Sequence, residues 1–147
     1  MDPVIFLYRV SHSLKKLRIP LLPTLFYLLN RILFSVVLPP EVRLGRNVKL
    51  AYLGLGTVIH RGAVIGNNVT IGPSVTIGGR SGKKELPVLE DDVFIGTGAR
   101  ILGPVRIGRN SVVGANSVVL SDIPANSVVV GIPAKVVRSD IAPGAFR

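Results

Sequence analysis

The stretch GAVIGNNVTIGPSVTIGG, residues 62–79, places an aliphatic residue at every sixth position. The same spacing continues outward in both directions along the chain. This aliphatic column consists of Leu44, Leu50, Ile59, Ile65, Ile71, Ile77, Leu89, Ile95, Ile101, Ile107, Val113 and Val119. A period of six fits neither an α-helix nor an alternating sheet strand, and it is typical of a solenoid whose turns stack. The sequence therefore predicts a mainly β fold, a parallel β-helix of hexapeptide repeats.

The other columns of the repeat agree with this prediction. The residue after the aliphatic is mostly glycine. Three places after the aliphatic stand residue types that accept a left-handed backbone at low cost, namely Asn47, Gly62, Asn68, Ser74, Asp92, Gly98, Asn110 and Asn116. One place further stand small residues such as Ala63 and Val69, which fit inside a narrow prism. Each hexapeptide is therefore expected to form one side of the prism and one corner.

The period is interrupted at two places. The first interruption, at residues 54–56, lengthens one step by three residues and predicts a local distortion of the coil. The second is the polar segment GGRSGKKELP, residues 78–87, which lies within a step of two periods. A polar, glycine-containing insertion of this kind is expected to protrude as a loop.

The pattern divides the chain into three parts. Residues 1–40 lack the repeat and are expected to be an N-terminal helical segment, with helices at residues 4–17 and 24–38 separated by prolines. Residues 41–138 are the predicted β-helix domain, and residues 139–147 form a C-terminal tail.

The helical segment has two interpretations. The first is a membrane-surface hairpin whose Lys15, Lys16 and Arg18 face anionic headgroups. The second is a cap that buries the open end of the solenoid or joins subunits. A bilayer-spanning helix needs about 20 uninterrupted apolar residues, and the segment has neither that length nor the features of a signal peptide. The predicted localisation is cytoplasmic, with peripheral contact to the inner membrane.

Composition limits the classes of partner and chemistry. The chain has 147 residues, a net charge of +10 and no cysteine, which excludes disulfides, thiolate metal sites and a cysteine nucleophile. The excess of basic residues favours anionic partners such as a lipid surface or a polyphosphate cofactor. Nucleic acid is not expected, because only 5% of residues are aromatic and the basic residues are scattered rather than striped.

The sequence contains two histidines, His12 and His60. His12 falls in the first expected helix and is interpreted as a surface or interface residue. His60 occupies the column that otherwise holds mostly glycine, where a side chain points away from the prism interior. Imidazole titrates near neutral pH and can take a proton from a hydroxyl, so His60 is the candidate catalytic base. The alternative is a substitution without consequence. Two histidines form no metal-binding cluster, so no metal is expected.

Two basic elements are candidates for binding an anionic cofactor. The loop that begins at residue 78 contains Gly78, Gly79, Arg80 and Lys83, and the tail adds Lys135 and Arg138. Glycine lets backbone amides approach a phosphate closely, and the cations neutralise it. Together the two elements would suit the 3′-phosphate and pyrophosphate of coenzyme A, although many ordinary exposed loops have a similar composition.

Residues 62–82 and 91–138 resemble the left-handed β-helix acyltransferases of the hexapeptide family, most closely the serine acetyltransferase branch. The resemblance implies left-handed coils, a homotrimer, and acetyl-CoA as co-substrate in the groove between adjacent subunits. Carried over from the family, the expected CoA contacts are Gly78, Gly79, Gly98, Ala99, Gly114 and Ala115, with Lys135 and Arg138 at the phosphates.

The chain departs from the serine acetyltransferase pattern at two places. The family's Asp-His pair aligns with Tyr52 and Leu53, and the histidine before the loop proline aligns with Leu86. The sequence GLGTVIH, residues 54–60, resembles instead small homologues found with polysaccharide-assembly enzymes, in which a histidine follows the aliphatic pair. This second resemblance favours His60 as the general base. The sequence does not identify a carboxylate that orients His60, and Asp91 and Glu41 are only guesses.

The predicted function is therefore acetyl-CoA-dependent O-acetyl transfer. The acceptor is either a hydroxyl of a sugar or polysaccharide precursor or that of L-serine, and a sugar amine is a further alternative. A non-catalytic solenoid scaffold is the alternative outside enzymology. The expected partners are two further copies of the chain in a homotrimer and a small-molecule or saccharide acceptor.

Overall fold

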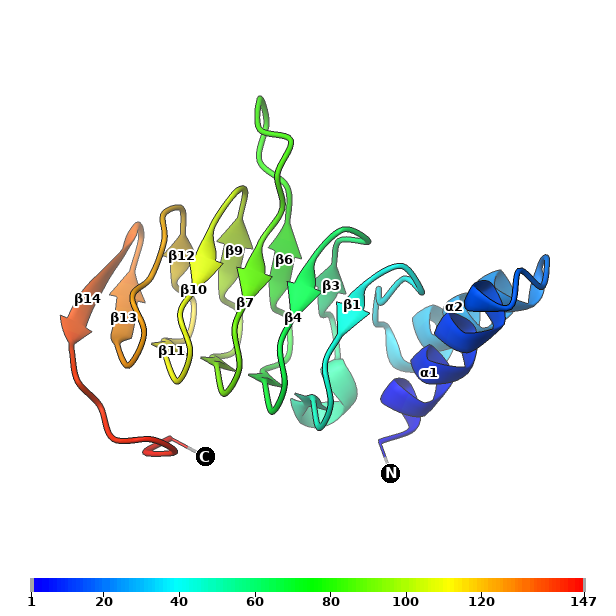
Figure 1. Ribbon diagram of the computed structural model, residues 1–147, viewed down its shortest axis with the longest axis horizontal. Coiled ribbons are helices and arrows are strands. Elements are labelled where there is room, and N and C mark those ends of the chain that lie inside the picture. The colour runs from blue at the N-terminus through cyan, green and yellow to red at the C-terminus, as the bar shows by residue number, and fades with distance from the viewer. Residues whose placement is uncertain (1, 147) are drawn as a thin grey trace.

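The computed structural model describes residues 2–146 and consists of a three-sided β-prism with two helices at its N-terminal end (Figure 1). The predicted fold class, a mainly β left-handed parallel β-helix with a short N-terminal helical segment, is confirmed. Each coil contributes one short strand to each of three sheets, which form the sides of the prism.

The first sheet contains β1 (Arg43–Leu44), β4 (Val64–Ile65), β7 (Val88–Leu89) and β10 (Arg106–Ile107). The second contains β2 (Lys49–Leu50), β5 (Thr70–Ile71), β8 (Phe94–Ile95), β11 (Val112–Val113), β13 (Val128–Gly131) and β14 (Ala134–Arg138). The third contains β3 (Val58–Ile59), β6 (Thr76–Gly78), β9 (Arg100–Leu102) and β12 (Val118–Val119). All of these strands pair in parallel except β14, which folds back antiparallel on β13.

The core of the prism is the aliphatic column that the sequence predicts. All twelve members of that column are buried, from Leu44 at 8% exposure to residues such as Ile59 and Ile95 at 0%. The small residues of the second interior column, among them Ala63 and Ala99, are also fully buried. Burying one aliphatic side chain stabilises the fold by about 1.5–3 kcal/mol, so the stacked column is a main source of its stability.

The corners of the prism explain the two remaining columns. Most residues three places after the aliphatic have positive φ, for example Asn68 at 55° and Asn116 at 56°. The glycine directly after the aliphatic lies against the next coil, because a Cβ at Gly96 would be 2.7 Å from the backbone nitrogen of Ala115. At most glycines of this column the neighbouring coil therefore approaches too closely for a side chain, whereas at Gly78 nothing lies nearer than 3.8 Å to an added Cβ.

Helices α1 (Pro3–Lys16) and α2 (Leu22–Phe34) pack against each other and cover the open N-terminal end of the prism. The side chain of Asp2 caps α1 by accepting from the backbone N–H of Val4 at 2.9 Å. The expected second helix was too long at its C-terminal end, because Ser35 has φ 55° and ends α2. Val37 then pairs with Val58 as an isolated bridge of the third sheet.

Two side chains of α1 attach the helices to the first coil. The buried hydroxyl of Tyr8 donates to the carbonyl oxygen of Val42 at 2.6 Å, and burial raises the pKa of this phenol. The guanidinium of Arg9 donates to the carbonyl oxygens of Leu44 and Gly45. These contacts favour the interpretation of the helices as a cap on the prism. Neither helix, nor any other in residues 2–146, has the length and apolar character needed to cross a membrane.

Both predicted interruptions of the repeat are confirmed as departures from the regular coil. The three-residue excess forms a short 3₁₀ segment, Ala51–Gly54, in which Tyr52 and Leu53 have positive φ. This segment begins slightly before the expected distortion at residues 54–56. The loop between β6 and β7 projects from the prism at the top of the view in Figure 1.

The close approach of coils at the glycine column predicts the effect of Gly96→Ala. The new methyl group would meet the backbone of the next coil, which cannot give way as a side chain can, so stability should fall by about 1–3 kcal/mol. Denaturant unfolding monitored by circular dichroism measures the difference. Gly78→Ala is the matched control, because the nearest atom to a Cβ there is 3.8 Å away. Equal stability of the two variants would contradict the prediction.

Candidate active site

His60 lies at the corner between the third and first sheets, directly after β3. We call this corner the loop corner; it comprises residues 60–63, 78–87 and 103–105. The backbone N–H of His60 donates to the carbonyl of Ile77 at 2.8 Å, and its imidazole is exposed. The Nδ1 atom accepts from the backbone N–H of Gly62 at 3.1 Å. In the neutral ring, Nδ1 therefore lacks the proton and Nε2 carries it.

A cavity of about 300 Å³ opens beside His60 on the outer face of the third sheet. Val58, Thr76 and Gly78 form the sheet side of this cavity, and Tyr27 of α2 contributes from the helical segment. The cavity therefore combines the exposed imidazole, a glycine expected to contact CoA, and a wall supplied by the N-terminal helices.

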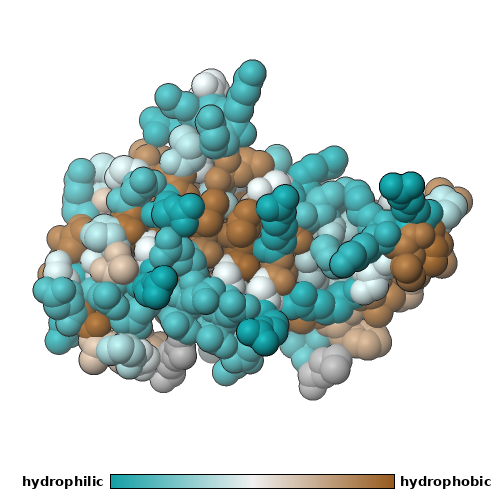
Figure 2. Space-filling model, viewed as in Figure 1, coloured by the Kyte–Doolittle hydropathy of each residue, from teal (hydrophilic) through white to brown (hydrophobic). Residues whose placement is uncertain are grey.

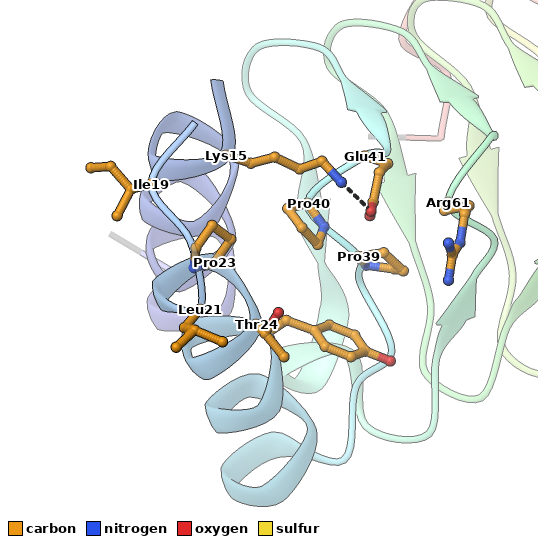
Figure 3. A pocket seen from close by; sticks show the side chains of 10 residues that line it. Lys15, Ile19, Leu21, Pro23, Thr24, Pro39, Pro40, Glu41 and Arg61 are labelled. Carbon is orange, nitrogen blue, oxygen red and sulfur yellow. Dashed lines mark hydrogen bonds and ion pairs between the residues drawn. The ribbon is translucent and has the colours of Figure 1, made fainter. Parts of the chain in front are cut away.

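A second cavity, of about 410 Å³, lies between the helices and the first coil (Figure 3). Tyr27, Pro39 and Arg61 line both cavities, so the two adjoin. In Figure 3, Leu21 and Lys15 lie on the helical side and Arg61 on the side of the prism. Together the two cavities make a continuous concave surface from His60 to the helical hairpin.

The protruding loop packs on both sides of the loop corner. The side chain of Leu86 occupies the space that a Cβ on Gly62 would need, next to the His60 ring. The Arg80 side chain covers Gly103, where an added Cβ would be 2.9 Å from Arg80 Cβ. The side chains of Arg80 and Lys83 are exposed, as binding of an anionic cofactor would require.

The other expected CoA residues lie elsewhere on the prism. Gly98, Ala99, Gly114 and Ala115 lie at the corner between the second and third sheets, which we call the far corner. Ala99 is fully buried, and its carbonyl accepts from the N–H of Thr76 at 3.0 Å. Gly114 and Ala115 are at least partly accessible. Gly78 and Gly98 thus lie at opposite edges of the third sheet.

Lys135 and Arg138 lie on β14, at the C-terminal end of the second sheet, and both side chains are exposed. Lys135 is the pairing partner of Val130, and Arg138 that of Val128. Within one chain, these cations are several coils away from His60. A bound cofactor that contacts them and Gly78 would have to extend along the prism.

Tyr52 and Leu53, which align with the family's Asp-His pair, are 83% and 43% exposed. They precede β3 at the far corner, whereas His60 follows β3 at the loop corner. His60 therefore does not occupy the place that the resemblance gives to the family's catalytic pair.

The hydrogen bonds of Glu41 and Asp91, the two carboxylates considered as partners of His60, go to other residues. Glu41 pairs with Lys15, and Asp91 accepts from the backbone N–H of Asn67 at 2.7 Å. Partial burial raises the pKa of Glu41, but the Lys15 contact, a backbone hydrogen bond and the charge of Arg61 together lower the pKa to below its usual value. The Asn67 amide likewise lowers the pKa of Asp91. The partner that orients His60 is instead the backbone amide of Gly62.

Sequence reasoning missed two residues of this surface, Tyr27 and Arg61. Tyr27 carries no signal in the sequence, because only the packing of α2 brings it beside the third sheet. Arg61 could have been noticed as a cation directly after the exceptional histidine. Residues 2–146 contain no group of three or more His, Cys, Asp or Glu side chains placed to hold a metal ion.

Comparison with known proteins gives one matching family model, bacterial transferase hexapeptide (six repeats), over residues 87–121. A serine acetyltransferase of Synechococcus elongatus is 41% identical over 88% of this chain and 54% of its own length. One from Helicobacter pylori is 37% identical over 90% of this chain and 78% of its own length. The chain thus spans about half the length of some curated relatives and most of the length of others.

Solved serine acetyltransferases share the fold. The enzyme of Neisseria gonorrhoeae superposes with a TM-score of 0.87 at 39% identity, over 97% of this chain and 56% of that chain. A serine acetyltransferase in complex with CoA superposes with a TM-score of 0.85 at 31% identity, over 93% of this chain and 57% of that chain.

The two histidines should adopt opposite neutral tautomers. His60 Nδ1 accepts from an amide, whereas His12 Nδ1 lies 2.7 Å from the carbonyl oxygen of Pro40 and must donate to it. Nitrogen-15 chemical shifts of the imidazoles, recorded above the pH at which the rings protonate, should show a proton on Nε2 of His60 and on Nδ1 of His12. Each residue is the control for the other, and a proton on Nδ1 of His60 would refute the described orientation.

Proposed function

The chain belongs to the hexapeptide-repeat acyltransferases of the serine acetyltransferase type, and from this membership we propose that it transfers the acetyl group of acetyl-CoA to the hydroxyl of L-serine. The observation that carries the proposal is the exposed imidazole of His60 at a cavity that also contains Gly78, the first glycine of the expected CoA loop. L-serine is the first acceptor to consider because the relatives are serine acetyltransferases.

Acetyl-CoA is the proposed co-substrate, and one related structure is a complex with CoA. Gly78 and Gly79 would lie along the pantetheine arm, with Arg80 and Lys83 as exposed cations above it. The phosphates would reach Lys135 and Arg138. Since those two residues are far along the prism from His60, an extended CoA molecule is required.

In the proposed reaction, the acceptor oxygen attacks the thioester carbonyl carbon, the C–S bond breaks, and the hydroxyl proton passes through His60 to the CoA sulfur. General bases contribute about 10²–10⁴-fold to such reactions. For His60 to accept the proton, Nδ1 must first lose its contact with the Gly62 amide. That released amide, or another backbone N–H of the loop corner, would then be available to the developing oxyanion.

Other hydroxyl acceptors form the second candidate function. The departure at Tyr52 and Leu53 supports it, since a phenol and an aliphatic side chain do not reproduce the carboxylate and imidazole of an Asp-His pair. The cavity of about 410 Å³ next to the His60 cavity would accommodate an acceptor larger than L-serine, such as a sugar hydroxyl or amine. The alternative to an enzyme is a non-catalytic scaffold. Calorimetry with CoA distinguishes the two, because a scaffold should not bind CoA.

A homotrimer is the proposed assembly, because the CoA groove of the family lies between subunits. Apolar side chains remain exposed along the prism, for example Val58 at 40% and Val137 at 60%. Their burial between prisms would stabilise the trimer in proportion to the apolar area removed from water.

The outer face of α2 is proposed to contact an anionic membrane surface. Leu25, Ile32 and Leu33 are 50%, 75% and 62% exposed, and apolar side chains gather at the helical end of the molecule in Figure 2. The exposed cations Arg18 and Arg31 flank this face and complement anionic headgroups.

Loss of the His60 imidazole should abolish most of the acetyl transfer. With L-serine as acceptor, His60→Ala should lower kcat/KM by about 10²-fold or more, because the general base is removed. Thiol release from acetyl-CoA measures the rate, and a panel of sugars replaces L-serine in parallel assays. His12→Asn is the control, since it removes the other imidazole and retains a donor toward Pro40. Equal rates in wild type and His60→Ala would place the base elsewhere.

Membrane contact predicts a loss of vesicle binding in Ile32→Glu. The carboxylate would lie within the apolar face and repel anionic headgroups. Co-sedimentation with phosphatidylcholine vesicles, with and without phosphatidylserine, measures binding. Ser121→Glu adds the same charge at an exposed position of the prism and should bind as wild type does. Failure of the wild type to sediment with either vesicle would refute membrane contact.

A further inference from the structure

Arg61 lies where the two cavities meet. It follows His60 directly in the loop corner, and its side chain lines both the cavity beside the imidazole and the larger one beneath the helices. Figure 3 places Arg61 across the larger cavity from Lys15 and Ile19 of the helical segment. A ligand whose hydroxyl reached His60 from this concave surface would pass the guanidinium.

The positive charge of Arg61 is not used by the fold. The ion pairs within residues 2–146 are Lys15–Glu41 and Arg106–Glu90, and neither includes Arg61. Glu41 is close enough for Arg61 to contribute to its lowered pKa, but that carboxylate already accepts from Lys15. Lys15 is therefore neutralised by its partner, whereas the Arg61 guanidinium keeps its donors for a ligand.

The remaining walls of the His60 cavity supply no competing cation near this point. Val58 and Thr76 form the sheet side, and Val37 and Pro39 also line the cavity. Tyr27, from α2, adds a phenol that can donate to an acceptor oxygen. The cavity is thus mostly neutral around a single guanidinium, an arrangement that suits a small acceptor with one anionic group.

We propose that Arg61 is the specificity-determining residue for the acceptor: its guanidinium binds an oxyanion of the acceptor, the carboxylate in the case of L-serine, and so directs the hydroxyl to His60. The inference rests on the proposed acetyl transfer. Guanidinium groups bind carboxylates through paired, charge-assisted hydrogen bonds, which fix orientation as well as affinity. Binding of the substrate anion at Arg61 would also explain why Glu41 is kept occupied by Lys15.

Kinetics with charged and neutral acceptors test the role of Arg61. Arg61→Ala should raise KM for L-serine by about 10- to 100-fold, the expected loss for hydrogen bonds between charged groups. The KM for acetyl-CoA and the activity with L-serinamide, which lacks the carboxylate, should stay near the wild-type values. Arg61→Lys should recover part of the loss, because it restores charge without the planar pair of donors.

Arg46→Ala is the matched control, because Arg46 is an exposed arginine of the first coil at a different corner. It should leave both acceptors unaffected. An Arg61→Ala variant that loses activity equally with L-serine and L-serinamide, or with neither, would overturn the inference.

Binding of L-serine, measured by calorimetry without acetyl-CoA, separates this inference from the proposed function. Binding that Arg61→Ala abolishes, in a wild type that releases no thiol, would support the anion site and refute the acetyl transfer. Thiol release that Arg61→Ala does not change would support the transfer and refute the anion site. A wild type that neither binds L-serine nor releases thiol would refute both.

Discussion

The close contact between successive coils at the prism corners is the constraint on which the rest of the structure depends. At two of the three corners, a glycine that follows an aliphatic core residue lies against the next coil, and a Cβ at Gly66 would be 2.6 Å from the carbonyl carbon of Glu90. That approach allows the coil-to-coil hydrogen bonds, such as Gly66 N–H to Leu89 O at 2.8 Å. At the loop corner this contact is looser, since a Cβ at Gly78 would meet nothing nearer than 3.8 Å, and His60 occupies the same column there beside the cavity.

Most of the prism could be predicted from the sequence because every hexapeptide repeats the same residue types at its core and corner positions. The buried column, the left-handed corners and the loop at residues 78–87 follow from six-residue spacing and from backbone preferences of single residues. The end of α2 could not be read in this way, since Ser35 adopts a left-handed backbone within an apolar run that continues to Leu38. There, pairing of Val37 with the third sheet prevails over helix propensity.

The candidate site could be predicted only in part. His60 was identifiable because it replaces the usual glycine after the aliphatic residue. Its orientation, however, depends on the backbone amide of Gly62, and a backbone amide leaves no signal in the sequence. The hydrogen bonds of Glu41 and Asp91 could not be read from the sequence for a related reason: they are made with Lys15 and Asn67, residues brought to them by the fold. Tyr27 and Arg61 meet at one cavity although they lie on a helix and a β-corner, and only the docking of the helical hairpin on the first coil brings them together.

The attachment of α1 to the first coil has a consequence for self-association. A stack of parallel strands ends in unpaired carbonyl and amide groups, which are templates for another chain and a route to fibres. At one end of this solenoid, Tyr8 and Arg9 occupy the carbonyls of Val42, Leu44 and Gly45. At the other end, β14 reverses direction and pairs antiparallel with β13, so the second sheet offers no parallel continuation. Tyr8 and Arg9 at the N-terminal end and β14 at the C-terminal end therefore occupy groups that a further coil of another chain would need for end-to-end stacking.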